Sequence, residues 1–193
     1  MWNEIEVRKS LDKREIRAVY TEETIRVYQA YSKLIAQEAV LKGTFGEHFK
    51  MDRMTWIKPS FLWMMYRCGW GEKENQEAVL AVDLKRSAFD EIVKNAVLSH
   101  YCSDMGITKD EWKEQIKQSD IRCQWDPERD IYGNALEYRS IQLGLRGQAV
   151  FHYVNDWIVR ITDISDYVKE LRDKKRNHMD IALLLPKERV YPY

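Results

Sequence analysis

Three stretches of the chain place cations, aromatic rings and carboxylates close enough together to bind and act on an anionic ligand. The first runs from residue 50 to residue 60 and contains Arg53, Trp56 and Lys58 just before a predicted helix N-terminus. Arg53 and Lys58 would attract a phosphate, the helix dipole would favour the same anion, and Trp56 would offer a stacking face. The alternative is that Trp56 belongs to the core and the cations are solvated, because Lys and Arg flank buried aromatics in many proteins.

The second stretch, residues 122–130, carries the candidate acid–base groups. On a strand, Arg122, Gln124 and Asp126 would share one face while the residues between them point to the other. So polar a face either lines a cleft or forms an internal salt-bridge network, because burying it without partners is costly. Asp126 or Glu128 could act as a general base, or Glu128 could bind a ribose hydroxyl.

The third stretch, residues 137–147, contains Arg139 and Arg146 with glycines on both sides of Arg146. The glycines could let the backbone approach a charged ligand closely, and ordinary turn formation explains them equally well. His152 follows in an apolar run, where it would be either a proton carrier or a satisfied core residue. This stretch therefore adds two candidate ligand-binding arginines.

Several established catalytic motifs are missing from the chain. It has no GxxxxGK[ST] loop of a P-loop ATPase or helicase, no GxGxxG turn and no GxSxG elbow. Its three cysteines and four histidines are too widely spaced for a zinc site or a disulfide framework. We therefore expect reduced, packed thiols and no metal site, and the sequence identifies no cofactor. These absences exclude particular mechanisms but leave other enzymes open.

The composition indicates one packed domain without a bulk attraction for nucleic acid. The chain has 193 residues, and its 31 Lys and Arg residues balance 31 Asp and Glu residues. This balance excludes a polybasic protein that binds phosphate through total charge, although a local basic face remains open. No apolar run approaches the roughly 18–20 residues that span a bilayer, and no secretory signal is recognisable. We therefore expect a cytoplasmic protein without a membrane partner.

The elements that must position these residues alternate irregularly between strand and helix. Hydrophobic spacing and capping signals predict strands at residues 15–20, 54–57, 78–84, 121–125 and 157–164, with a turn at 126–128 and an ambiguous segment at 133–147. The same signals predict helices from about 21 to 43, 60 to 68, 87 to 98, 108 to 118, 148 to 154 and 165 to 175, and an extended C-terminal tail. Capping boxes are expected at Ser87 with Asp90 and at Thr108 with Glu111.

This order lacks consistent βαβ phasing, which favours an α+β fold over a doubly wound sheet. We expect a single compact domain over residues 1–193, with a mixed or antiparallel sheet and several flanking helices. Residues 1–14 are highly charged and are expected to be loosely held. No repeat or Pro/Gly-rich linker divides the chain.

Five ordered blocks together resemble the family known as domain of unknown function 4291. They read EIRAVYTEETIRVYQAYS, MTWIKPSFLWMMYRCGW, RCQWDPERD, RSIQLGLRG and LLPKERVYPY, and they span the chain essentially end to end. The resemblance brings no activity, cofactor or catalytic residue with it. Some members are labelled helicase-like, a label that the missing P-loop does not support here. The resemblance implies that the three polar stretches are family hallmarks, which favours a site around residues 53–60, 122–129 and 139–146.

The leading hypothesis is a cleft for a nucleotide or a nucleic-acid phosphate group. Its ligand-binding residues would be Arg53, Trp56, Lys58, Arg122, Gln124, Arg139 and Arg146, with Asp126 or Glu128 as the acid–base group. A metal-independent transferase would suit this inventory, and ADP-ribosyltransferase-like chemistry is conceivable. The alternative is a non-enzymatic RNA-, DNA- or protein-binding module with an open basic and aromatic surface and salt-sensitive binding. A purely structural protein would instead show a large exposed apolar patch and no polar cleft.

Overall fold

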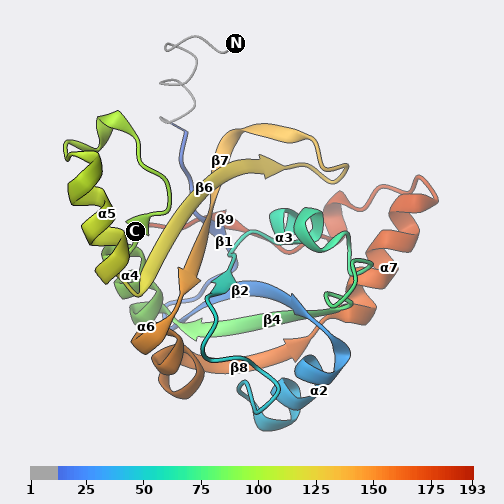
Figure 1. Ribbon diagram of the computed structural model, residues 1–193. Helices are drawn as coiled ribbons and strands as arrows, with labels where there is room; N and C mark the ends of the chain where they lie inside the picture. Colours follow the sequence, from blue (N-terminus) through green and yellow to red (C-terminus); the bar gives the residue numbers. More distant parts are fainter. Residues whose placement is uncertain (1–12) are drawn as a thin grey trace.

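Two β-sheets meet across the main core in the computed structural model, which describes residues 13–193 (Figure 1). The antiparallel three-stranded sheet has the order β2 (Thr24–Tyr31), β4 (Ala78–Lys85), β8 (Ile158–Asp163). The four-stranded sheet has the order β3 (Thr55–Ile57), β7 (Ala135–Leu145), β6 (Ile121–Arg129), β5 (Val97–Leu98), and only β5 pairs in parallel. A small ladder joins β1 (Arg17–Ala18) to β9 (Arg189–Val190). The predicted α+β fold in a single compact domain is confirmed.

The main core lies between the facing sides of the two sheets. Strand β4 supplies Leu80, Val82 and Leu84, and β7 supplies Leu143 and Leu145, all of them buried. Alternate residues of each strand enter this core because the side-chain period of a strand is two. The remaining surface is covered by α2 (Lys33–Lys42), α4 (Arg86–Asn95) and α6 (Gly147–His152), which is followed by a π-helical turn at Tyr153–Trp157.

A second core on the other face of the three-stranded sheet is covered by α3 (Phe61–Cys68) and α7 (Ser165–Arg176). Helix α3 begins where the Ser60 hydroxyl accepts a hydrogen bond from the Trp63 amide at 3.1 Å. It ends at Gly69, whose left-handed φ of 59° is easiest for glycine. Because α3 contacts both β2 and β6, it brings the two sheets together beside the site described below (Figure 1).

Several predicted elements are confirmed where their signals are local. These are the strands near 54–57, 78–84 and 157–164, helix α3, and α5 (Lys109–Gln118). In α5 the Thr108 hydroxyl accepts from the Glu111 amide, and the Glu111 carboxylate accepts from the Thr108 amide. Helix α7 and the tail agree as well, and the tail contains a 3₁₀ turn (Ala182–Leu184) before β9. A second 3₁₀ turn, Ser103–Met105, precedes α5.

The prediction of a helix from Thr21 to Gly43 is wrong in its first half. Residues 24–31 form β2, which pairs with β4 along its whole length, and α2 begins only after Ser32. Both faces of β2 are buried, with Val27 in the main core and Tyr28 in the second core. Apolar residues therefore do not alternate with polar ones, and their positions also fit the spacing of a helix. The Thr21 hydroxyl accepts the amides of residues 23 and 24 and thereby forms a turn.

Two other boundaries also differ from the prediction. Strand β6 continues through the expected turn at 126–128, with an irregularity after Pro127, and the chain reverses only at residues 130–134. There the Asp130 carboxylate accepts the amides of Tyr132 and Asn134, and the ambiguous segment becomes β7. Helix α4 begins at Arg86 without a side-chain cap and ends at Asn95, so the capping box at Ser87 and Asp90 is not formed.

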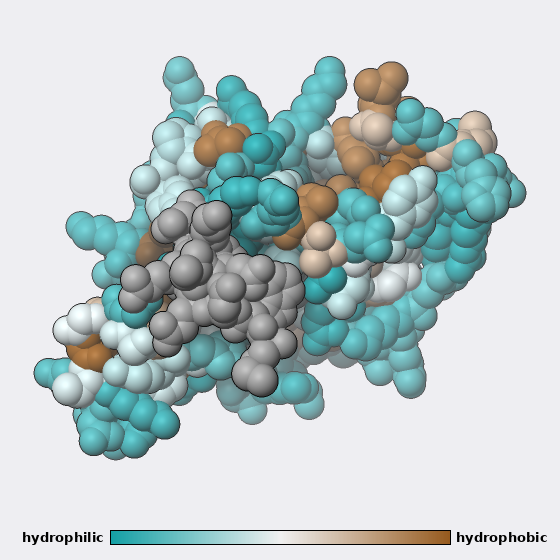
Figure 2. All heavy atoms as spheres, turned by 90° about the horizontal axis from the view of Figure 1, so that it is seen from above, coloured by the Kyte–Doolittle hydropathy of each residue, from teal (hydrophilic) through white to brown (hydrophobic). Residues whose placement is uncertain are grey.

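The predicted loose start of the chain lies almost entirely outside the described residues. Of that segment the structure describes Lys13 and Arg14, and the Lys13 carbonyl accepts the Arg139 amide at 2.9 Å. Within residues 13–193 no helix combines the length and apolar character that crossing a bilayer requires. Figure 2 shows the molecule from above the view of Figure 1. On this face hydrophilic side chains surround several separate apolar groups.

Candidate functional site

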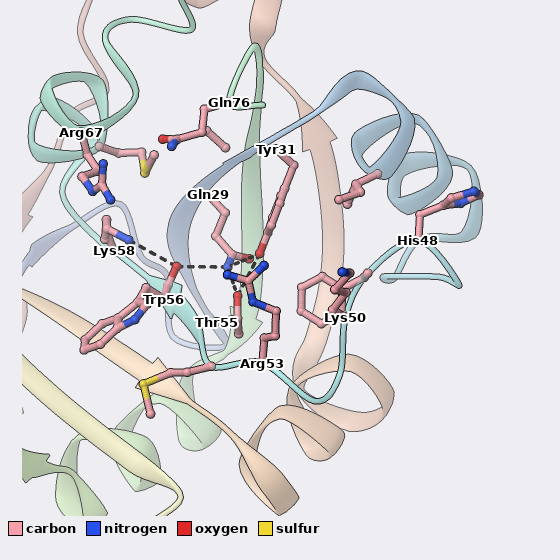
Figure 3. A pocket seen from close by; sticks show the side chains of 15 residues that line it. Gln29, Tyr31, His48, Lys50, Arg53, Thr55, Trp56, Lys58, Arg67 and Gln76 are labelled. Atoms are coloured by element: carbon pink, nitrogen blue, oxygen red, sulfur yellow. Dashed lines mark hydrogen bonds between the residues drawn. The ribbon is translucent and has the colours of Figure 1, made fainter. Parts of the chain in front are cut away.

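A cationic cleft of about 340 Å³ lies where the end of β2, the loop before β3 and helix α3 meet (Figure 3). Among the described residues that line it, none is acidic and five carry basic side chains, namely His48, Lys50, Arg53, Lys58 and Arg67. In Figure 3 Arg67 descends from α3 and Arg53 rises from the loop toward the same region. A recess walled by one sign of charge attracts ions of the opposite sign. The lining therefore favours an anion.

The floor of the cleft is a buried hydrogen-bond network centred on Gln29, which is 2% exposed. The Gln29 amide nitrogen donates to the Thr55 hydroxyl at 2.7 Å and to the Trp56 carbonyl at 3.1 Å. The Gln29 oxygen accepts from the Tyr153 hydroxyl at 2.6 Å, and Tyr31 lies within hydrogen-bond distance of Thr55. Burial raises the pKa of both phenols, so they stay protonated. A fully bonded floor of this kind holds its side chains in one arrangement.

Lys58 is the buried cation of the cleft, with 6% of its surface exposed. Its Nζ donates one long hydrogen bond, of 3.4 Å, to the Trp56 carbonyl and lies 5.3 Å from the centre of the Trp63 ring. Desolvation, assisted by the charge of Arg67, lowers the pKa of Lys58 to about 7, while Asp126 acts in the opposite direction. Burial therefore favours the neutral amine over the ammonium form here.

The loop cations differ from one another in their partners. The His48 ring and backbone amide both contact Glu38, which also accepts from Lys42 and from the Glu47 amide, so Glu38 ties this wall of the cleft to α2. Among the described residues, the side chains of Lys50, Arg53 and Arg67 make no hydrogen bond or ion pair. All three are exposed, so their charges remain available at the mouth of the cleft.

The second predicted stretch lies on the sheet next to the cleft. Pairing of β6 with β7 sets Arg122 opposite Gly144, Gln124 opposite Gln142 and Asp126 opposite Ser140, so the three polar residues of β6 share one face. Asp126 accepts from the Gln124 amide at 2.9 Å and from the Gln142 amide at 2.6 Å. These bonds hold Asp126 on the same side of the sheet as Trp56, which pairs with Gly144.

Gly144 lies within β7, one residue before its end, so the turn interpretation, one of the two left open for this glycine, does not apply to it. A Cβ atom at this position would lie 2.7 Å from Met54 Sδ and 3.0 Å from Cζ2 of Trp56. The missing side chain therefore lets the indole lie across β7 at the edge of the cleft. Gly147, by contrast, has a left-handed φ of 53° and begins α6.

Glu128 is buried away from the cleft lining, at the N-terminus of α3. Its carboxylate accepts from the Ser60 and Ser140 hydroxyls and from the Arg129 amide, while burial raises its pKa. Glu188, in the C-terminal tail, lies close enough to be influenced by the charge of Glu128. Its carboxylate accepts a hydrogen bond from the Phe61 backbone amide at 2.7 Å. Burial, together with the charge of Glu128, raises the pKa of Glu188 to about 8. This carboxyl pair joins β6, α3 and the tail.

The third predicted stretch does not reach the cleft. Arg146 donates to the Lys117 and Ser119 carbonyls at 2.6 and 3.1 Å and so ties the end of α5 to β7. Arg139 lies on the opposite face of β7 from Ser140 and donates to the Trp125 carbonyl at 3.1 Å. Arg122 is half-buried and also lies outside the lining.

Sequence reasoning thus brought together Arg53, Trp56 and Lys58, which the structure places in one cleft. It missed Gln29 and Arg67, although a glutamine within an otherwise apolar strand and an arginine on an apolar helix were visible signals. His152 is exposed, pairs with Asp156 and stacks on Trp157, so its core placement is wrong.

The lining can hold an anion, stack a ring and offer an amine and a phenol to a bound molecule, and Asp126 lies on the sheet beside it. Within residues 13–193 no group of three or more His, Cys, Asp or Glu side chains could hold a metal ion. A search of curated proteins finds no match to the chain. The profile of the domain of unknown function (DUF4291) matches residues 15–191, which include the cleft, both sheets and the tail. The chain therefore belongs to the DUF4291 family.

Proposed function

We propose that the protein binds a phosphorylated, ring-containing small molecule, of which a nucleotide is the leading example, in the cationic cleft. The supporting observation is that the lining collects five basic residues and, among the described ones, no carboxylate. Cations gathered in one recess repel one another, and a bound phosphate would remove that repulsion while accepting charge-assisted hydrogen bonds.

Each part of such a ligand has a candidate partner. Lys50, Arg53 and Arg67 are the unpaired cations that would hold phosphate oxygens. Trp56 is partly exposed and offers an aromatic face to a base. Gln76 would hydrogen-bond the polar edge of the ring system. A cleft of about 340 Å³ has the size of sites that take small molecules.

We propose metal-independent group transfer at the bound nucleotide as the reaction class, with ADP-ribosyl transfer as one form of it. Asp126 is the acid we assign to it, because its charge acts on Lys58 and two amides hold its carboxylate in place. Glu128 is assigned to the fold, since serine hydroxyls and a backbone amide occupy its carboxylate.

A thermal-shift and calorimetric screen against ATP, GTP, NAD and short RNA and DNA tests the binding proposal. A ligand at about 100 times its Kd should stabilise the protein by roughly 2.7 kcal/mol. Arg53→Gln should weaken binding about tenfold or more, since a hydrogen bond to a charged group contributes about 1.5–3 kcal/mol. Lys169→Gln, a change at an exposed position on α7, is the matched control and should bind as the parent protein does.

Three results decide between the proposals. Binding of a mononucleotide that Arg53→Gln weakens and Lys169→Gln does not supports the proposed site in the cationic cleft. Binding of oligonucleotides alone, falling steeply as salt rises, would replace it with the RNA- or DNA-binding module. No binding by any ligand, or equal loss in both variants, would refute the proposal.

We further propose that the protein works in the cytoplasm. Cys68, Cys102 and Cys123 are all free thiols, as a reducing compartment maintains them. Fractionation of cells that produce the full chain checks this location.

A further inference from the structure

We propose that Lys58 is a nucleophile that forms an imine with the free carbonyl group of a sugar phosphate bound in the cationic cleft. This inference rests on the proposed function, because the phosphate must first be held by the cations at the mouth. It adds the substrate class, a phosphorylated sugar with an open-chain aldehyde or ketone, and assigns covalent chemistry to one side chain.

Lys58 is placed unlike the other described lysines. Lys42, Lys113 and Lys174 extend from helices and pair with carboxylates near the surface. Lys58 is the buried lysine of the described chain, and none of the ion pairs among residues 13–193 includes it. An ammonium group in such a place is costly, because burial removes its water and, among residues 13–193, Asp126 acts on it only from a distance without forming an ion pair.

The amine of Lys58 is also not committed to holding the fold together. A lysine nitrogen can make three hydrogen bonds, and among the described residues it makes one, at the long distance of 3.4 Å to the Trp56 carbonyl. It also lies over the face of Trp63, with 5.3 Å between Nζ and the ring centre. Burial and the charge of Arg67 favour loss of its proton, which leaves a lone pair free to react.

The cleft would orient a sugar phosphate for this reaction. Lys50 and Arg53 lie exposed at the mouth, where they would hold the phosphate, while Lys58 is buried within the lining. The carbonyl end of the sugar would then point inward, toward the amine. Buried lysines with lowered pKa values are suited to imine formation because a neutral amine is the reactive form.

The step balances without a further reactant. The Lys58 lone pair forms a nitrogen–carbon bond to the carbonyl carbon, and the carbonyl oxygen takes up two protons and leaves as water. The two amine protons account for that water, and a carbon–nitrogen double bond remains. Nothing is oxidised or reduced, and the reaction reverses when water returns.

Borohydride trapping tests the inference on the full chain. The protein is incubated briefly with ribose 5-phosphate or with ADP-ribose, treated with sodium borohydride to convert any imine into a stable secondary amine, and mapped by peptide mass spectrometry. The expected result is a saturable adduct at Lys58 in great excess over the exposed lysines, which serve as internal controls for unspecific glycation. Lys58→Arg should lose the adduct, and Lys169→Gln should keep it in full.

The two probes distinguish the possible sources of the carbonyl. Labelling by ribose 5-phosphate alone supports a free sugar phosphate, and labelling by ADP-ribose alone supports a reducing ribose at the end of a nucleotide. ADP, which has no free carbonyl, should compete with either probe without becoming attached. The rate of trapping should rise between about pH 6 and 8 as the amine loses its proton, a readout that does not depend on the folding of a variant.

The inference and the proposed function fail separately. If ADP or a sugar phosphate binds and Arg53→Gln weakens that binding, but Lys58 is labelled no faster than the exposed lysines, the imine is refuted and the anion site stands. If no phosphorylated ligand binds and Lys58 is not labelled, both are refuted.

Discussion

Replacing Lys58 with methionine should stabilise the protein at neutral and acidic pH, although Lys58 lies in the proposed site. Methionine keeps the unbranched length of the side chain and removes its charge. The pKa of Lys58 is about 7 in the folded protein against its ordinary value of 10.5. Between these values the unfolded chain binds one proton more than the folded protein. The stability that the neutral amine permits is therefore complete above about pH 10.5 and is lost as the pH falls toward 7.

The size of the effect follows from this window. Each pH unit corresponds to about 1.4 kcal/mol, so a window of roughly 3.5 pH units corresponds to at most about 5 kcal/mol. Local relaxation and water entry reduce the penalty for a buried charge to a few kcal/mol in real proteins. We therefore expect Lys58→Met to gain about 2–5 kcal/mol in unfolding free energy at pH 6, and the gain to vanish toward pH 10.

Urea unfolding of the two proteins at about pH 6, 8 and 10 measures this difference directly. All other titrating groups are common to both proteins, so their contributions cancel in the comparison. Lys50→Met is the matched control, since Lys50 is exposed and its replacement should give a difference that does not change with pH.

One outcome would refute the reasoning about Lys58. If Lys58→Met destabilised the protein at pH 6, or if the difference between the two proteins stayed constant from pH 6 to about 10, the folded protein would be compensating the charge. Lys58 would then stabilise the folded protein, and the inference that its amine is free to react in the cleft would be refuted.

Three further predictions concern other parts of the chain. Gly144→Val should lower the unfolding free energy by about 1–3 kcal/mol in urea and weaken nucleotide binding, because the new Cβ would lie 3.0 Å from the Trp56 ring. Unchanged binding would show that the Trp56 indole takes no part in the site. Thr108→Ala should cost about 1 kcal/mol in the same assay, because the Glu111 amide loses its cap, and should leave ligand affinity unchanged, since α5 does not line the cleft. Glu188→Gln should stabilise the protein more at pH 8 than at pH 5: the pKa of Glu188 is about 8 in the fold and ordinarily 4.5, so the parent loses stability as pH rises through that window. A gain that did not grow with pH would show that Glu188 is solvated.

The proposed site explains why the chain keeps so costly a residue. A buried lysine without a counter-ion lowers stability, and such residues are retained where function requires them. The cations at the mouth of the cleft also lower stability by repelling one another, because the Lys50, Arg53 and Arg67 side chains have no ion-pair partner in the described structure. Binding an anion would recover part of this free energy.

Local signals predicted elements whose hydrogen bonds are formed by near neighbours. Ser60 caps α3 three residues before Trp63, and Thr108 caps α5 three residues before Glu111. Such contacts depend on the chain within one turn of helix, so the sequence contains all the information that they need.

Elements buried on two sides were harder to predict. Strand β2 has Val27 in one core and Tyr28 in the other, and its apolar pattern matches a helix as well as a strand. Strand β6 carries Pro127 at an irregularity in its pairing with β7, where a proline and two acids were interpreted as a turn. For β2 the deciding partner is β4, a strand far away along the chain. For β6 it is β7, the next strand of the hairpin, whose pairing carries β6 past the local turn signal.

The sequence alone was enough to determine the α+β fold, the family and the cationic and aromatic character of residues 50–60. Arg53, Trp56 and Lys58 could be grouped because they lie within one short segment. Only the tertiary structure decided that Lys58 is buried without an ion-pair partner among residues 13–193, and that Gln29 and Arg67 line the same cleft. It also decided that Arg139 and Arg146 bind backbone carbonyls elsewhere. The physical reason is that desolvation and the field of other charges set the reactivity of an ionisable group, and both come from residues that the fold, and not the order of the chain, brings near.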